Sequence, residues 1–136
     1  MSCSSAIYTS SQNVDVAPNG VIPFGSINRR FGCNCQLSGN DIVCSGRGYY
    51  LVSVTASVTP DAAGLIGIQL YADGSPVPGA DAYATGTTDA TVPLSITPVL
   101  VRVRCDAAKS LSVRLVSGDA TTGAVVMSTH ATVVKV

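Results

Sequence analysis

The chain has 136 residues, which is the length of one ordinary domain and too short for two separate cores. Its 8 basic and 8 acidic residues balance, which argues against nucleic-acid or membrane binding driven by bulk charge. Only 12% of the residues are charged, against about 25% in a typical soluble domain. We therefore expect part of the neutral surface to be buried against other chains. The alternative is a sandwich with a neutral exterior rich in serine and threonine.

The first residues, Met1 to Ser5, contain neither a basic stretch nor an apolar stretch. They lack the two features of a secretory leader, so we expect a protein that stays in the cytoplasm or leaves it by assembly or cell lysis. No apolar run reaches the roughly 18 residues of a membrane span, and we expect no membrane insertion. We interpret residues 1–12 as an N-terminal arm that contacts neighbouring proteins or subunits, and residues 13–136 as a single domain.

The early part of the chain predicts short strands at residues 6–10 and 21–24 and a hairpin at residues 35–44. Gly39 and Asn40 form its two-residue turn, because both tolerate positive φ. Counting outward pairs Cys35 with Cys44 at a non-hydrogen-bonded position, where side chains approach most closely. A disulfide between them is feasible in an oxidising compartment. Two reduced, buried thiols are the alternative.

The other cysteines are Cys3, Cys33 and Cys105. Counting alone allows a second disulfide between Cys33 and Cys105. Cys33-Asn34-Cys35 also has the form of half a zinc site, but zinc sites usually take a second cysteine pair or histidines at similar spacing. We predict no metal site and no cofactor.

The clearest strand covers residues 48–59 and alternates strictly in polarity. We expect its inner face to consist of Tyr50, Val52, Val54, Ala56 and Val58. After a turn at residues 60–64, residues 65–72 predict a second strand with Ile66, Ile68 and Leu70 on one face. We expect these two strands to pair as a hairpin.

Further strands are predicted at residues 80–85, 90–97, 99–105, 111–117 and 124–136. Pro98 marks a break between two strands, a bulge or an edge. On the last strand we expect Val125, Met127, Ala131 and Val133 to point inside. Short strands with turns every 8–12 residues or so indicate an all-β sandwich or barrel.

No catalytic constellation is visible in the sequence. His130 is the only histidine, there is no glutamate, and no Gly-x-Ser-x-Gly motif is present. We predict no catalytic residue and no enzymatic activity. Three copies of His130 around an axis could bind a metal or an anion, and a hydrogen-bonded or half-exposed histidine is the alternative. Arg102 and Arg104 share a strand face with Leu100, and we expect them to be surface or intersubunit groups.

Two motifs carry a resemblance to a known superfamily. Gly48-Tyr49-Tyr50-Leu51-Val52-Ser53-Val54 resembles the Gly-x-Tyr strand of C1q and tumour-necrosis-factor-like jelly rolls, and Ile68-Gln69-Leu70-Tyr71-Ala72-Asp73-Gly74 fits the family's next strand and turn. Residues 106–109 depart from the Gly-Asp turn that the family often has. The turn at residues 74–80 is similar to that of bacterial and phage members, such as exosporium-tip and prophage-encoded proteins. The resemblance implies an antiparallel two-sheet jelly roll of 8–10 short strands that forms a compact homotrimer.

The strand that begins at Gly48 is apolar on both faces near its start, which favours cover on both. We therefore expect the trimer interface to include Tyr49 and Leu51. A loop of the same chain over that face is the alternative. On the last strand we expect the interface to include Ser128, His130 and Thr132, because small or polar side chains suit three strands packed around an axis.

The predicted function is a structural and interaction module on a phage or prophage virion: a head fibre, a capsid decoration or a tail-associated adhesion domain. Its partners would be further copies of itself, neighbouring virion proteins and a host-surface glycan. A spore-coat or exosporium-type surface protein is one alternative. The other is a lectin-like domain, for which Tyr71 and Tyr83 are the candidate sugar-stacking residues. The sequence does not indicate which residues bind a ligand.

Overall fold

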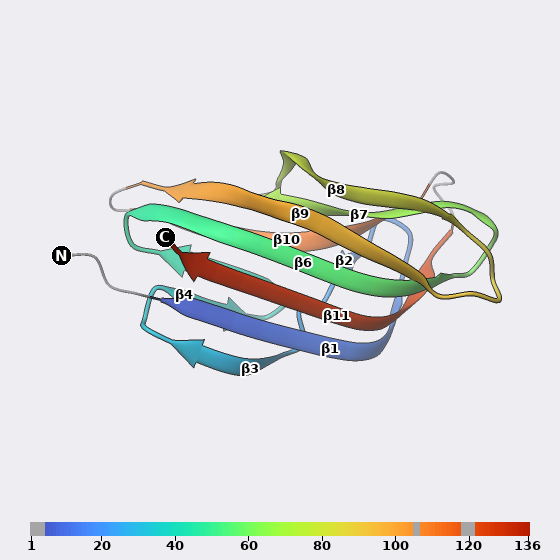
Figure 1. Cartoon of the computed structure of the whole chain (residues 1–136), viewed down its shortest axis with the longest axis horizontal. Helices are drawn as coiled ribbons and strands as arrows, with labels where there is room; N and C mark the ends of the chain where they lie inside the picture. Colours follow the sequence, from blue (N-terminus) through green and yellow to red (C-terminus); the bar gives the residue numbers. More distant parts are fainter. Residues whose placement is uncertain (1–4, 105–106, 118–121) are drawn as a thin grey trace.

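The computed structural model describes residues 5–104, 107–117 and 122–136, which form two antiparallel sheets packed face to face (Figure 1). The first sheet has five strands, in the order β3 (Ser26–Phe31), β1 (Ala6–Val16), β11 (Ala124–Lys135), β6 (Gly48–Pro60) and β9 (Val92–Val103). The second sheet has the order β4 (Cys35–Ser38), β5 (Asp41–Ser45), β10 (Ala108–Ser117), β7 (Gly64–Ala72) and β8 (Ser75–Gly86), with β2 (Val21–Ile22) beside β10. The predicted all-β jelly roll is confirmed.

The core lies between the two sheets and is filled by alternate residues of each strand. On β6 the predicted inner face is buried from Tyr50 to Val58, and on β7 the predicted Ile66, Ile68 and Leu70 are buried. Apolar burial of this kind is the main driving force for folding. Because one face of each strand fills the core, the other face of the five-stranded sheet is left to solvent.

The expected hairpin between residues 48–59 and 65–72 is wrong. Strand β6 pairs with β11 and β9, whereas β7 pairs with β10 and β8 in the other sheet. Residues 61–63 therefore carry the chain from one sheet to the other. Turn-forming residues at 60–64 can join two strands of one sheet or lead from one sheet to the other. The sequence does not distinguish these cases, because in both of them each strand buries one face.

The expected inner face of the last strand is wrong in its first half. Ala131 and Val133 are buried as predicted, but Met127 is 40% exposed, Val125 is only partly buried, and Val126 and Thr129 are buried instead. The register against β6 shifts between Val126 and Ser128. This β-bulge adds a residue and reverses which side chains point inward on one side of it.

Three further details concern strands of the five-stranded sheet. Residues 92–103, which take in most of the two strands predicted on either side of Pro98, form the single edge strand β9, and the register against β6 shifts there, so Pro98 marks a bulge. Strand β3 at the other edge was not predicted, because all six of its residues are exposed and show no alternation. Residues 6–12, interpreted as part of an arm, lie within β1 between β3 and β11.

Candidate functional site

A row of apolar side chains crosses the outer face of the five-stranded sheet, the face that turns away from the other sheet. The strand register places five residues beside one another, one from each strand: Phe31, Ala6, Val134, Leu51 and Leu100. The two ends of this apolar row are the most open to solvent, with Leu100 60% exposed and Phe31 54% exposed. An exposed apolar stripe that spans a whole sheet is typical of a surface that another protein covers.

Tyrosines lie on both sides of the apolar row. Tyr49 on β6 is 49% exposed, and Tyr8 on β1 is 37% exposed. Tyr8 stacks on His130, with ring centroids 6.1 Å apart, and its hydroxyl lies 3.1 Å from Nδ1 of His130. His130 is therefore oriented by Tyr8 within the same chain.

From the row of Tyr8 onward, several paired residues on the outer face of β11 and β6 are small and polar. Thr132 and Ser128 of β11 pair with Ser53 and Ser57 of β6. Short hydroxyl side chains allow the backbone of another sheet to approach closely and can exchange hydrogen bonds with it.

The five residues predicted for a trimer interface lie on this one outer face. Tyr49 and Leu51 alternate with the buried residues of β6, and Ser128, His130 and Thr132 alternate with those of β11. Their contact with another subunit stays a prediction. The sequence did not indicate Phe31 or Tyr8. Phe31 joins the apolar row only by pairing with Ala6 of β1, and Tyr8 meets His130 only because β1 pairs with β11, 122 residues further along the chain.

The predicted register of the cysteine hairpin is confirmed, since Cys35 pairs with Cys44 across β4 and β5. Gly39 takes a φ of +60° in the turn. Both cysteines are buried free thiols whose Sγ atoms lie 2.7 Å apart, and Cys33 is exposed. The thiol hydrogen bond lowers the pKa of Cys35 and raises that of Cys44, because the Cys44 proton stabilises a thiolate on Cys35. The disulfide stays a prediction, and Cys3 and Cys105 lie outside the described residues.

Tyr50 is packed beside this cysteine pair. Its hydroxyl donates a shared hydrogen bond to the carbonyl oxygens of Ser45 and Gly46, at 2.9 and 2.8 Å. Burial raises the pKa of Tyr50 to about 12, because the phenolate form loses its water, and negative charge on the neighbouring Cys35 and Cys44 contributes to this rise.

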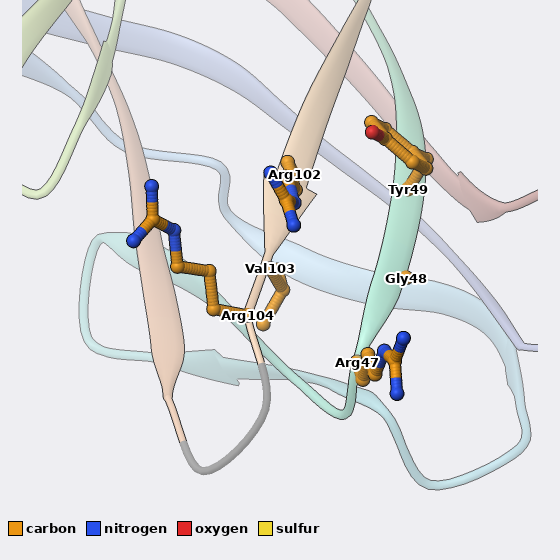
Figure 2. A pocket seen from close by; sticks show the side chains of 6 residues that line it. All are labelled: Arg47, Gly48, Tyr49, Arg102, Val103 and Arg104. Atoms are coloured by element: carbon orange, nitrogen blue, oxygen red, sulfur yellow. The ribbon is translucent and has the colours of Figure 1, made fainter.

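Strand β6 begins and β9 ends at the same end of the sandwich (Figure 1). A cleft of about 630 Å³ lies there. Arg47, Gly48 and Tyr49 line it from the start of β6, and Arg102, Val103 and Arg104 from the end of β9. Figure 2 shows Arg102 between Arg104 and Tyr49, with Arg47 nearby and the guanidinium groups apart from one another. We call this site the arginine cleft.

The two tyrosines considered for sugar stacking both have partners within the chain. The ring of Tyr83 covers Gly67 of the neighbouring strand so closely that a Cβ atom at Gly67 would overlap it. Tyr71 lies under the guanidinium of Arg114, whose Cζ is 4.9 Å from the ring centroid. Each ring therefore has a structural role.

Within residues 5–104, 107–117 and 122–136, no three His, Cys, Asp or Glu side chains are grouped so that they could hold a metal ion. No helix long and apolar enough to cross a membrane occurs in that part of the chain.

Among known proteins, this chain is similar to several in structure but to none in sequence. No protein-family model matches the sequence, and no curated protein matches it. Murine APRIL superposes with a TM-score of 0.73 and 12% identity over 98% of this chain and 100% of its own. The globular domain of zebrafish complement 1qA gives 0.66 and 12% over 98% and 95%. The PRD1 vertex protein P5 gives 0.60 and 13% over 97% and 96%. The fold is therefore a jelly roll of the C1q and tumour-necrosis-factor type, as the sequence motifs predicted.

Proposed function

We propose that this protein is a non-enzymatic structural module that assembles as a homotrimer through the outer face of its five-stranded sheet. The apolar row carries the proposal, because it runs across all five strands and ends in the exposed side chains of Leu100 and Phe31. Burying apolar surface is favourable by about 25 cal/mol per Å². A second copy of the chain presents the same row and is a matched partner.

Two other observations support a trimer. Because few residues of the chain are charged, there is little electrostatic repulsion to oppose contact between the outer faces of two copies. The resemblance to C1q and tumour-necrosis-factor-like jelly rolls implies a three-fold arrangement. In this arrangement Tyr49, Leu51, Ser128, His130 and Thr132 contact the neighbouring subunits.

We place the trimer on the surface of a phage or prophage virion, as a head fibre, a capsid decoration or a tail-associated adhesion domain. The likeness to the PRD1 vertex protein P5 supports this setting. The partners would then be neighbouring virion proteins. Immunogold labelling of purified virions with an antibody against this protein tests the proposed location. Virions that carry no label would contradict it.

Substitutions on the two sheets test the interface. Leu51→Asp and Leu100→Asp place charges in the apolar row, and we expect both variants to sediment as folded monomers, because a charge buried without a partner is costly. Leu65→Asp is the matched control, because Leu65 is a similarly exposed leucine on β7 of the other sheet. We expect the control to keep the trimer mass.

Circular dichroism separates loss of assembly from loss of folding in these variants. Trimers of unchanged mass for both Leu51→Asp and Leu100→Asp would show that the apolar row is not the interface. If the Leu65→Asp variant dissociated instead, the interface would lie on the second sheet, which contains β7.

A further inference from the structure

The arginine cleft concentrates positive charge on a chain that is neutral overall. Arg47, Arg102 and Arg104 are three of its eight basic residues, and among the residues that the structure describes no acidic side chain lines the cleft. Lys135 adds a fourth cation close by, since a Cβ atom at Gly48 would lie 3.0 Å from its Cε. Like charges gathered in a hollow repel one another and raise the local potential, which attracts anions.

No polar group in the described part of the chain pairs with the guanidinium groups of these three arginines. In the described part of the chain the one ion pair joins Lys109 to Asp73, and none of the three guanidinium groups has a hydrogen bond or an ion pair there. Arg47 precedes β6, and Arg102 and Arg104 come from the end of β9, so two elements distant in sequence supply the charge. As far as the described residues go, their donors are free to bind a ligand.

We propose that the arginine cleft binds an acidic saccharide through its carboxylate or sulfate groups. Guanidinium groups bind such oxyanions with paired hydrogen bonds. The three groups stand apart in Figure 2, which fits several negative groups along one ligand better than a single ion. The half-exposed ring of Tyr49 lies in the same cleft and offers a flat apolar surface to a sugar ring.

The size of the cleft fits this class of ligand. A volume of about 630 Å³ lies within the range of sites that hold small organic ligands. Nucleic acid fits less well, because its binding needs basic charge over a longer surface. The described residues that line the cleft all belong to one chain, and one of them, Tyr49, also belongs to the proposed trimer interface, so a ligand and a neighbouring subunit would both contact Tyr49.

Calorimetric titration of the full chain tests the proposal. The probes are a uronic-acid oligosaccharide, its sulfated counterpart, a neutral oligosaccharide of the same length, inorganic sulfate and a poly-aspartate peptide. We expect the two acidic saccharides to bind, more weakly as salt is added because the charges are screened. The neutral saccharide should not bind, and sulfate and poly-aspartate should bind far more weakly than the acidic saccharides.

Substitutions in the arginine cleft test which residues bind the acidic saccharide. Arg47→Gln, Arg102→Gln and Arg104→Gln should each lower the affinity for the acidic saccharide about tenfold, the value of one charge-assisted hydrogen bond. Arg29→Gln should leave it unchanged, because Arg29 is an exposed arginine on β3 at the opposite edge of the same sheet. Tyr49 stays unaltered in these variants, and sedimentation of each shows whether assembly has changed independently of binding.

Three results would overturn the proposal. One is unchanged affinity in all three cleft variants. Another is equal binding of the neutral saccharide. The third is poly-aspartate or free sulfate binding as tightly as the acidic saccharides, which would assign the cleft to an acidic protein segment or to a free anion.

Discussion

Tyr50 links the core to the turn between β5 and β6 through its shared hydrogen bond to Ser45 and Gly46. Its pKa is raised to about 12, against about 10 for an exposed tyrosine. The neutral phenol therefore contributes stability that is fully present below about pH 10 and is lost as the pH rises through about 12.

Comparison of the wild type with Tyr50→Phe isolates this contribution. The variant loses the hydrogen bond and should unfold with a free energy lower by about 1–2 kcal/mol near neutral pH. Its stability should also fall less steeply than that of the wild type between about pH 10 and 12. Urea unfolding at a series of pH values measures both effects. Parallel pH profiles would contradict the account of Tyr50.

Cys35 and Cys44 face each other at the register position that allows a disulfide. We predict that mild oxidation joins them, with the loss of two hydrogen atoms in the intact mass, while Cys33 reacts first with a bulky thiol reagent because it is exposed. The bond closes a short loop and should stabilise the chain by roughly 2–3 kcal/mol. Cys44→Ser is the control. An oxidised wild type in which peptide mapping finds Cys35 joined elsewhere would refute the pairing.

At the scale of the elements, the bulge in β11 makes a specific prediction. Val126 is fully buried and Met127 is 40% exposed. We expect Val126→Ala to lower the free energy of unfolding by about 2 kcal/mol, because it leaves a cavity in the core. Met127→Ala should change it by less than about 0.5 kcal/mol. Chemical denaturation of the two variants measures both changes. A larger loss of stability in Met127→Ala than in Val126→Ala would contradict the bulge, because it would place Met127 in the core, as uninterrupted alternation requires.

The strands differ in how far the sequence predicts them. Residues 48–60 alternate without a break, and in residues 64–72 the large apolar side chains fall on Ile66, Ile68 and Leu70, so both inner faces could be predicted from the sequence. Strand β11 has a bulge that no residue type announces, and β3 has no buried residue to produce a pattern. The partner of each strand was the harder problem, because alternation fixes a face but not a neighbour. For that reason the expected β6–β7 hairpin failed while both strands were correct.

At the scale of the whole molecule, both candidate surfaces depend on residues that only the fold brings together. The motif at Gly48 indicated Tyr49 and Leu51, but the apolar row also needs Phe31 and Leu100 from the two edge strands. The arginine cleft likewise joins Arg47 to Arg102 across β6 and β9. The sequence could therefore predict a face that needs cover, but neither its full extent nor the basic cleft at its end.

The central claim is that the outer face of the five-stranded sheet is closed by two further copies of the chain. Light scattering of the unmodified protein over a range of concentrations tests it most directly. We predict one species with three times the chain mass of 13.8 kDa. A mass of 13.8 kDa at every concentration would contradict the claim.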